Sequence, residues 1–135
     1  MTACGHIARL PKCSRIQANA DFRIAREEGI RLAKGCILAN WRPIPECSRS
    51  RLGVVTSRRI GKAHVRNRTR RLLRECFRLH NHEILQPVDL VLVARRSIVG
   101  RSFQSVERHF LLLLKKVGLL PDNVAPTYPT NTLKK

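Results

Sequence analysis

The chain has 135 residues, which is enough for one domain with terminal extensions and too few for two ordinary domains. Its 27 lysine and arginine residues outnumber 9 acidic residues and give a formal net charge of +18, far more than solubility requires. This charge indicates a polyanionic partner, and nucleic acid is favoured over a membrane because only 4% of the residues are aromatic and no apolar run could span a bilayer.

The N-terminal part is predicted to contain an arm and a short helix. Residues 1–18 carry basic side chains, no acid and no clear periodicity, so we expect them to form a mobile basic arm. Asn19 is a suitable N-cap for the helix that follows, Phe22 lies on its apolar side, and Gly29 is expected to end it.

Three stretches have the pattern of β-strands. Residues 36–41 and 52–57 alternate between two faces, and residues 88–94 are apolar almost throughout, as in a strand buried on both faces. Asp89 lies inside the last of these strands, where we interpret it as a paired structural residue. One additional short strand is compatible with the rest of the sequence.

The most basic part of the chain is the stretch 58–78. Against a single acid, Glu75, it contains nine lysine and arginine residues: Arg58, Arg59, Lys62, Arg66, Arg68, Arg70, Arg71, Arg74 and Arg78. An amphipathic helix over 64–78 would gather the apolar residues on one side: Val65, Thr69, Leu72, Leu73, Cys76 and Phe77. A merely solvated helix would intersperse acids among its arginines, so the opposite side is predicted to bind phosphates.

The C-terminal part completes the predicted domain. Ser102 is expected to cap a last helix, whose apolar residues recur at helical spacing and which Gly118 ends. Residues 119–135 contain prolines and no core-forming pattern, so we expect a disordered tail. The ordered part, 19–118, is therefore predicted to be one α+β domain with the order αββαβα.

The sequence contains no constellation for catalysis by the protein. It has no paired carboxylates, no nucleophile beside a base and no phosphate-binding glycine loop. The five cysteines are odd in number and lack a CxxC pair, and no secretory h-region is present, which indicates reduced thiols and a cytoplasmic location. Cys76, His80 and His82 are too few ligands for a structural metal site, so no metal is expected on the protein.

Three segments together resemble one known family. The stretch VVTSRRIGKAHVRNRTRRLLRECFR, with the triplet Arg66, Asn67 and Arg68, is similar to the signature segment of the protein subunit of bacterial ribonuclease P. Asp21 and Phe22 before it and the strand LVLVARR after it match the family at the same spacing. The resemblance is specific because the triplet lies within a strand, a glycine turn and an arginine-rich helix, and it covers most of the predicted domain.

This resemblance implies a fold, an activity and partners. The fold is an α/β sandwich like domain 2 of ribosomal protein S5, with a left-handed βαβ crossover where sequence pattern alone would predict the common right-handed form. The activity is that of a ribonucleoprotein endoribonuclease that removes the 5′ leader of precursor tRNA, with the chemistry and its Mg²⁺ ions in the RNA subunit. The partners are that catalytic RNA and the leader, with one protein per RNA.

The resemblance also assigns two sets of binding residues and no catalytic residue. The residues expected to contact the RNA subunit are Arg58, Arg59, Lys62, Arg66, Asn67, Arg68, Arg70, Arg71 and Arg74. The residues expected in the leader-binding cleft are Phe22, Arg26 and Asn40. Arg26 and Asn40 stand where many members have aromatic residues, so leader binding is expected to depend more on charge and hydrogen bonds than on stacking.

Two other functions remain open from the residues alone. A ribosomal or other structural RNA-binding protein could use the same helix to clamp an RNA junction, without a role in tRNA processing. A DNA-binding regulator could place residues 64–78 in a major groove, although no partner helix at helix-turn-helix spacing precedes them. Stimulation of cleavage by the RNA enzyme would separate the ribonuclease P interpretation from both.

Overall fold

The computed structural model describes residues 15–16, 19–47 and 49–121. In chain order its elements are α1 (Asn19–Glu28), β1 (Ile30–Lys34), β2 (Ile37–Pro43), β3 (Arg51–Val55), η2 (Arg58–Ile60), α2 (Ala63–His80), η3 (Asn81–Glu83), β4 (Val88–Ala94), η4 (Arg96–Ile98) and α3 (Phe103–Lys116). The predicted order αββαβα is present, with β1 and the short 3₁₀ turns added to it. Most of the predicted arm and of the predicted tail lies outside the described residues.

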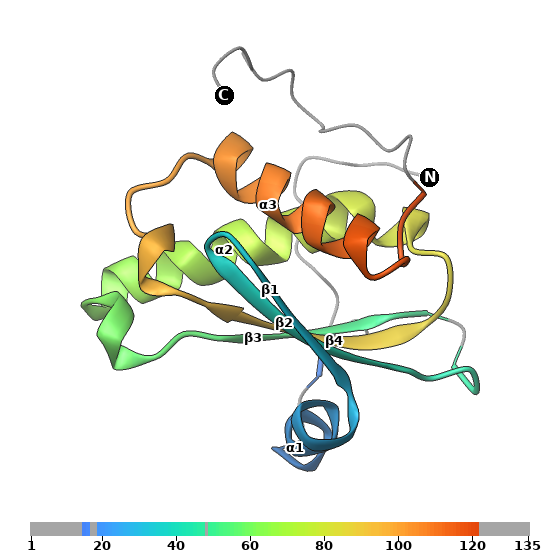
Figure 1. The fold of residues 1–135 in the computed structure, drawn as a ribbon. Coiled ribbons are helices and arrows are strands. Elements are labelled where there is room, and N and C mark those ends of the chain that lie inside the picture. Colours follow the sequence, from blue (N-terminus) through green and yellow to red (C-terminus); the bar gives the residue numbers. More distant parts are fainter. Residues whose placement is uncertain (1–14, 17–18, 48, 122–135) are drawn as a thin grey trace.

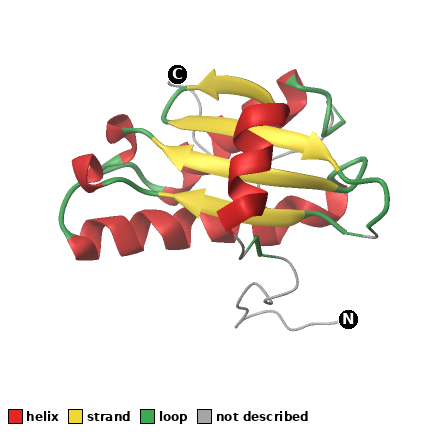
Figure 2. Cartoon of the chain, turned by 90° about the horizontal axis from the view of Figure 1, so that it is seen from below, coloured by secondary structure: helices red, strands yellow, loops and turns green. Residues whose placement is uncertain are grey.

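The four strands form a mixed sheet in the order β1-β2-β4-β3. β2 pairs antiparallel with β1 and β4, whereas β3 and β4 are parallel neighbours joined through α2 (Figure 2). A parallel pair requires such a crossover, and this is the connection whose left-handed form the family resemblance implies. β1 is the additional short strand that the sequence left open. Its residues are exposed or half-buried, so it lacks the apolar alternation that reveals a strand.

Helices cover both faces of the sheet. α1 lies against one face, and α2 and α3 lie against the other (Figure 1). Leu90 and Leu92 of β4 belong to the core cluster under α2 and α3, whereas Val91 packs with Ala25 of α1. β4 is therefore buried on both faces, as its continuous apolar sequence predicts.

Helix α2 has the amphipathic character predicted for it. It extends from Ala63 to His80, slightly beyond the predicted range of 64–78 at both ends. Its buried residues are Thr69, Leu73, Cys76, Phe77 and His80. Just before it, Gly61 has a φ of +148°, so the entry to the helix depends on a conformation that glycine adopts readily. None of the described helices combines the length and apolar character that crossing a membrane requires.

The hydrophobic core extends beyond both predicted domain boundaries. On the N-terminal side, Ile16 is buried, and its N–H donates to the carbonyl oxygen of Leu52 at 2.8 Å, which places this segment along β3. After the last helix, Leu119 and Leu120 are buried in the main core cluster. The predicted range of 19–118 therefore omits residues at each end that take part in packing.

Helix α3 is held by polar contacts at its start and in its middle. Ser102 caps it as predicted, because its side-chain oxygen accepts a hydrogen bond from the N–H of Ser105 at 3.2 Å. The buried Glu107 lies 2.7 Å from Nε2 of His80, and Nδ1 of the same ring lies 2.7 Å from Glu83. Both ring nitrogens of His80, at the end of α2, are therefore in contact with carboxylates. Among the described residues, no group of three or more histidine, cysteine or acidic side chains is arranged so that it could hold a metal ion.

Candidate nucleic-acid interface

The solvent-facing side of α2 and the turn before it carry the residues predicted to contact RNA. Those in η2 and directly before α2 are exposed: Arg58, Arg59 and Lys62. Those on α2 are exposed or half-buried: Arg66, Asn67, Arg68, Arg70, Arg71 and Arg74. We call these nine residues the arginine face. The structure places them all on one helix and its entry turn, because the apolar residues take the side that packs on the core.

The positive charges of the arginine face are not neutralised by acidic residues in the described part of the chain. The acid on α2, Glu75, accepts two hydrogen bonds from Arg78 at 2.9 and 2.6 Å, and Arg78 is not part of the face. Within the face, Arg70 donates to the neutral side-chain oxygen of Asn67 at 2.7 Å. The guanidinium groups therefore remain able to bind an external anion.

The N-terminal segment adds one more positive charge beside the arginine face. Burial lowers the pKa of the Arg74 guanidinium, and the charges of Arg15 and Arg70 lower it further. Nε of Arg15 is itself buried without a hydrogen-bond partner among the described residues. Such mutual repulsion is relieved when an anion binds between the groups. The sequence analysis assigned Arg15 to a basic arm and did not place it beside α2, because its position depends on a bridge to Leu52 of β3, which is distant along the chain.

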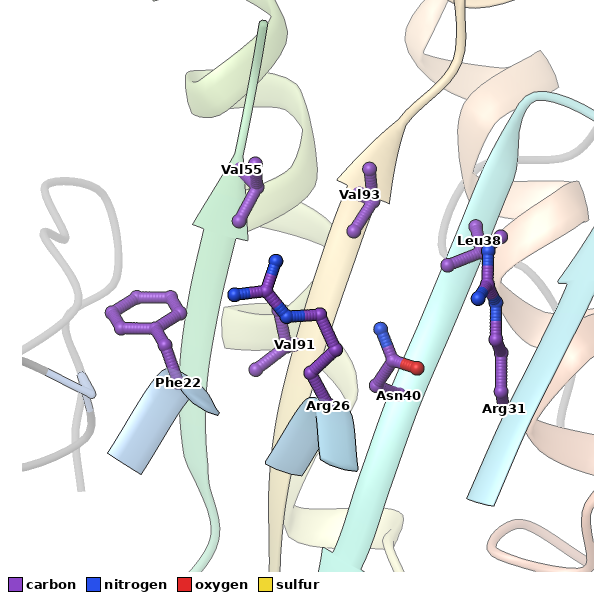
Figure 3. Close-up of a pocket in the computed structure, with 8 residues that line it drawn as sticks. All are labelled: Phe22, Arg26, Arg31, Leu38, Asn40, Val55, Val91 and Val93. Carbon is purple, nitrogen blue, oxygen red and sulfur yellow. The ribbon is translucent and has the colours of Figure 1, made fainter. Parts of the chain in front are cut away.

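A pocket of about 270 Å³ lies on the opposite face of the sheet, beside α1. Figure 3 shows the side chains that line it: Phe22, Arg26, Arg31, Leu38, Asn40, Val55, Val91 and Val93. The structure thus brings together the three predicted cleft residues, Phe22, Arg26 and Asn40. It adds Arg31, which lies on β1, the additional short strand that the sequence allowed, and an apolar floor of valine and leucine side chains.

The floor of the pocket depends on the register of the sheet. Arg31, Asn40, Val91 and Gly53 are successive cross-strand partners on β1, β2, β4 and β3. A Cβ atom at Gly53 would lie 2.4 Å from Cε1 of Phe22, so the aromatic ring occupies the space that a side chain would take. An isolated glycine in a strand is a signal of such close approach, but only the structure identifies what approaches it.

A buried ionic network supports the helix that carries Phe22. Arg51 donates from Nε and Nη2 to the two carboxylate oxygens of Asp89, each at 2.8 Å, and from Nη1 to Asp21 at 3.4 Å. Arg42 lies 3.4 Å from the same buried carboxylate. The hydrogen bond with Asp89 is the largest cause of the raised pKa of Arg51. The prediction that Asp89 is a paired structural residue is confirmed, and Asp21 connects this pair to α1.

Together these surfaces define a single-domain α/β protein that binds nucleic acid, with a basic helix on one side of its sheet and a small cationic pocket on the other. A model of the Ribonuclease P family matches residues 10–118, and the chain belongs to this family. It therefore has the role of the protein subunit of ribonuclease P, a ribonucleoprotein endoribonuclease of tRNA processing. A structural RNA-binding role without processing is not favoured.

Individual relatives agree with this assignment. The ribonuclease P protein component of Syntrophomonas wolfei is 34% identical over 114 residues, covering 84% of this chain and 95% of that protein. That of Clostridium botulinum is 34% identical over 109 residues, covering 80% of this chain and 97% of that protein.

Solved structures agree as well and confirm the predicted fold class. The RNase P protein of Staphylococcus aureus has a TM-score of 0.75 at 26% identity, covering 82% of this chain and 100% of that chain. The RNase P protein of Thermotoga maritima has a TM-score of 0.69 at 31% identity, covering 76% of this chain and 96% of that chain.

Proposed function

We propose that the arginine face binds the catalytic RNA subunit of ribonuclease P and that the pocket beside α1 holds the single-stranded 5′ leader of precursor tRNA, with one protein per RNA. The observation that carries this proposal is the absence of acidic partners for the arginine face among the described residues. The two surfaces lie on opposite faces of the sheet, so one protein molecule can contact both RNAs at once (Figure 1).

In this proposal the protein acts by binding, through ordinary electrostatics. Each guanidinium group presents a planar set of donors that matches a phosphate in a bidentate manner. The catalytic RNA and the precursor tRNA are both polyanions and repel each other. A protein that contacts phosphates of the catalytic RNA and the leader of the precursor tRNA reduces that repulsion and keeps the two RNAs together.

The chemical step is assigned to the RNA. The two carboxylates that are buried in the described part of the chain are engaged, since Asp89 is bonded to Arg51 and Glu107 contacts His80. No group of three or more histidine, cysteine or acidic side chains among the described residues could hold a metal ion. We place the Mg²⁺ ions that promote phosphodiester hydrolysis in the RNA subunit, because this chain belongs to the ribonuclease P family.

The proposal is tested by a cleavage assay with the RNA subunit at low Mg²⁺ concentration, with and without this protein. We expect the protein to stimulate removal of the leader, because its charge replaces part of the screening that Mg²⁺ otherwise provides. An RNA subunit that cleaves equally well without the protein across the Mg²⁺ range would contradict the proposal.

Within the arginine face, Arg66→Ala is expected to weaken binding of the RNA subunit by about 1 to 3 kcal/mol, the range for a hydrogen bond to a charged group. Arg66 is half-buried on α2, and its Nε is buried without a hydrogen-bond partner among the described residues. A filter-binding titration measures the change, and Lys116→Gln, at an exposed position of α3, serves as a control. Unchanged affinity would remove Arg66 from the interface.

In the pocket, Phe22→Ala is expected to reduce cleavage of precursors with long leaders, because a stacked base contributes about 1 to 3 kcal/mol. Gly53→Ala should have a similar effect with Phe22 still present, because the added Cβ would lie 2.4 Å from the ring and displace it. Binding of mature tRNA, which has no leader, is the control. If the variants reduce cleavage of leader-bearing precursors and binding of mature tRNA by equal factors, the ring has no role in leader binding.

A further inference from the structure

An acidic residue lies next to the pocket that is proposed to hold a polyanion. Asp21 directly precedes Phe22, whose ring lines the pocket, and the Asp21 side chain is 27% exposed. A carboxylate at this position repels the phosphates of a leader. The chain has only 9 acidic residues against 27 lysine and arginine residues, so an acid beside this pocket requires an explanation other than leader contact.

The partner of Asp21 connects the first turn of α1 to the sheet. Nη1 of Arg51, on β3, donates to Oδ2 of Asp21 at 3.4 Å. The same guanidinium group is held by two hydrogen bonds of 2.8 Å to the buried carboxylate of Asp89 on β4. Arg51 therefore presents a fixed donor to α1.

This contact lies beside the floor of the pocket. Arg51 and Asp89 are cross-strand partners, and the next pair on the same face, two residues along each strand, is Gly53 with Val91. Val91 lines the pocket, and the ring of Phe22 lies over Gly53. The ion pair and the aromatic ring thus occupy neighbouring rows of the sheet.

The apolar packing of α1 is limited. Among its 10 residues, Ala25 is the buried one, and it belongs to a small cluster that is separate from the main core. The C-terminal end of α1 is held by close backbone packing, since a Cβ atom at Gly29 would lie 2.5 Å from the carbonyl oxygen of Trp41. The contact of Asp21 is therefore the polar attachment at the opposite end of the helix.

We propose that Asp21 is a positioning residue for leader binding, which acts by holding the ring of Phe22 against the sheet. This inference rests on the proposed function of the pocket. The contact with Arg51 fixes the first turn of α1, and Phe22 is the next residue along that turn. A Cβ atom at Gly53 would lie 2.4 Å from Cε1 of the ring, so the ring closes directly on the strand. A displaced first turn moves the ring away and opens one side of the pocket.

The two effects that Asp21 can have on leader binding differ in sign. As a charge it repels the leader, so Asp21→Asn would strengthen leader binding. As a positioning residue it orders the pocket, so the same substitution weakens leader binding. We expect the second effect to dominate, because the charge of Asp21 is already paired with Arg51. The expected loss is about fivefold, the upper range for a partly exposed ion pair.

The measurement is single-turnover cleavage by the reconstituted ribonucleoprotein over a range of enzyme concentrations, with precursors that carry a long leader or a leader of one nucleotide. Asp21→Asn should raise the half-saturating concentration for the long leader and leave the maximal rate and the one-nucleotide leader unchanged. Asp21→Glu, which retains the charge in the first turn, should restore most of the affinity. In Phe22→Ala protein, Asp21→Asn should have no further effect, since both changes remove the same contact with the leader.

The outcomes separate this inference from the proposed function. Unchanged or tighter binding of the long leader by Asp21→Asn would overturn the role of Asp21 and leave leader binding intact, and so would equal losses for the two leaders. A wild-type protein that does not stimulate cleavage would overturn both proposals.

Affinity for the RNA subunit, measured for each variant, shows that it is folded. If Asp21→Asn does not fold, Arg51→Lys decides the question. Lysine retains a charge beside Asp89 and lacks the planar fork that serves two carboxylates at once. This variant should reproduce the loss for the long leader, and wild-type binding of that leader by Arg51→Lys would overturn the inference.

Discussion

Raising the salt concentration from about 50 to about 200 mM is expected to weaken the complex of this protein with the catalytic RNA by about 10³-fold or more, if six or more phosphates are contacted. The arginine face provides eight cationic side chains and Asn67, and none of these cations pairs with an acid in the described part of the chain. Each phosphate contact releases a condensed counterion from the RNA, and the affinity therefore falls with every added contact.

The salt dependence is measured as the slope of log affinity against log salt concentration in filter-binding titrations. Removing one contacting arginine, as in Arg71→Gln, should reduce that slope by about one. A flat slope for the wild-type protein would mean that the complex is not held by phosphate contacts.

The second large effect concerns stability: Arg51→Met is expected to lower the free energy of unfolding by about 3 kcal/mol. Breaking a buried ion pair by removing one partner costs about 3–5 kcal/mol, because the other charge remains buried. Asp89 has no solvent exposure, and the ion pair that would remain to it among the described residues is the longer contact with Arg42 at 3.4 Å. We take the lower end of the range because the Arg51 side chain itself is 28% exposed.

Urea unfolding measures this change, with Arg71→Met as the matched control. The control removes the same charge from an exposed position of α2, where substitutions usually change stability by less than about 0.5 kcal/mol. Equal unfolding midpoints for the two variants would show that the network around Asp89 does not stabilise the fold. Arg51→Met should also disturb α1, whereas the control should not, since Arg51 contacts Asp21 on that helix.

The sequence predicted those parts of the fold that have strong local periodicity. The amphipathic helix α2 and the apolar strand β4 were recognised in the sequence. Their buried residues recur with the period of a helix in α2 and form a continuous apolar run in β4. β1 was not recognised as a defined strand, since a short strand at the edge of the sheet with exposed residues has no such pattern. The packing of Ile16, Leu119 and Leu120 depends on long-range contacts, which local composition does not reveal.

The candidate site was predictable only in part. The basic side of α2 follows from helical periodicity, whereas the assignment of Arg58, Arg59 and Lys62 to the same surface and the grouping of Phe22, Arg26 and Asn40 came from the family resemblance. The structure shows that these three line one pocket. The roles of Gly53 and Arg51 required the cross-strand register, because their partners lie on other elements.

The central claim is that a localised helix face, and not net charge alone, binds the catalytic RNA. Its most direct test compares two double variants that lose the same charge in filter-binding titrations with the RNA subunit at physiological salt. Arg68→Gln with Arg71→Gln, on the exposed side of α2, should weaken binding by about 100-fold, which corresponds to about 2.7 kcal/mol. Arg108→Gln with Lys116→Gln, at exposed positions of α3, should leave the affinity unchanged. Equal losses in the two double variants would contradict the claim.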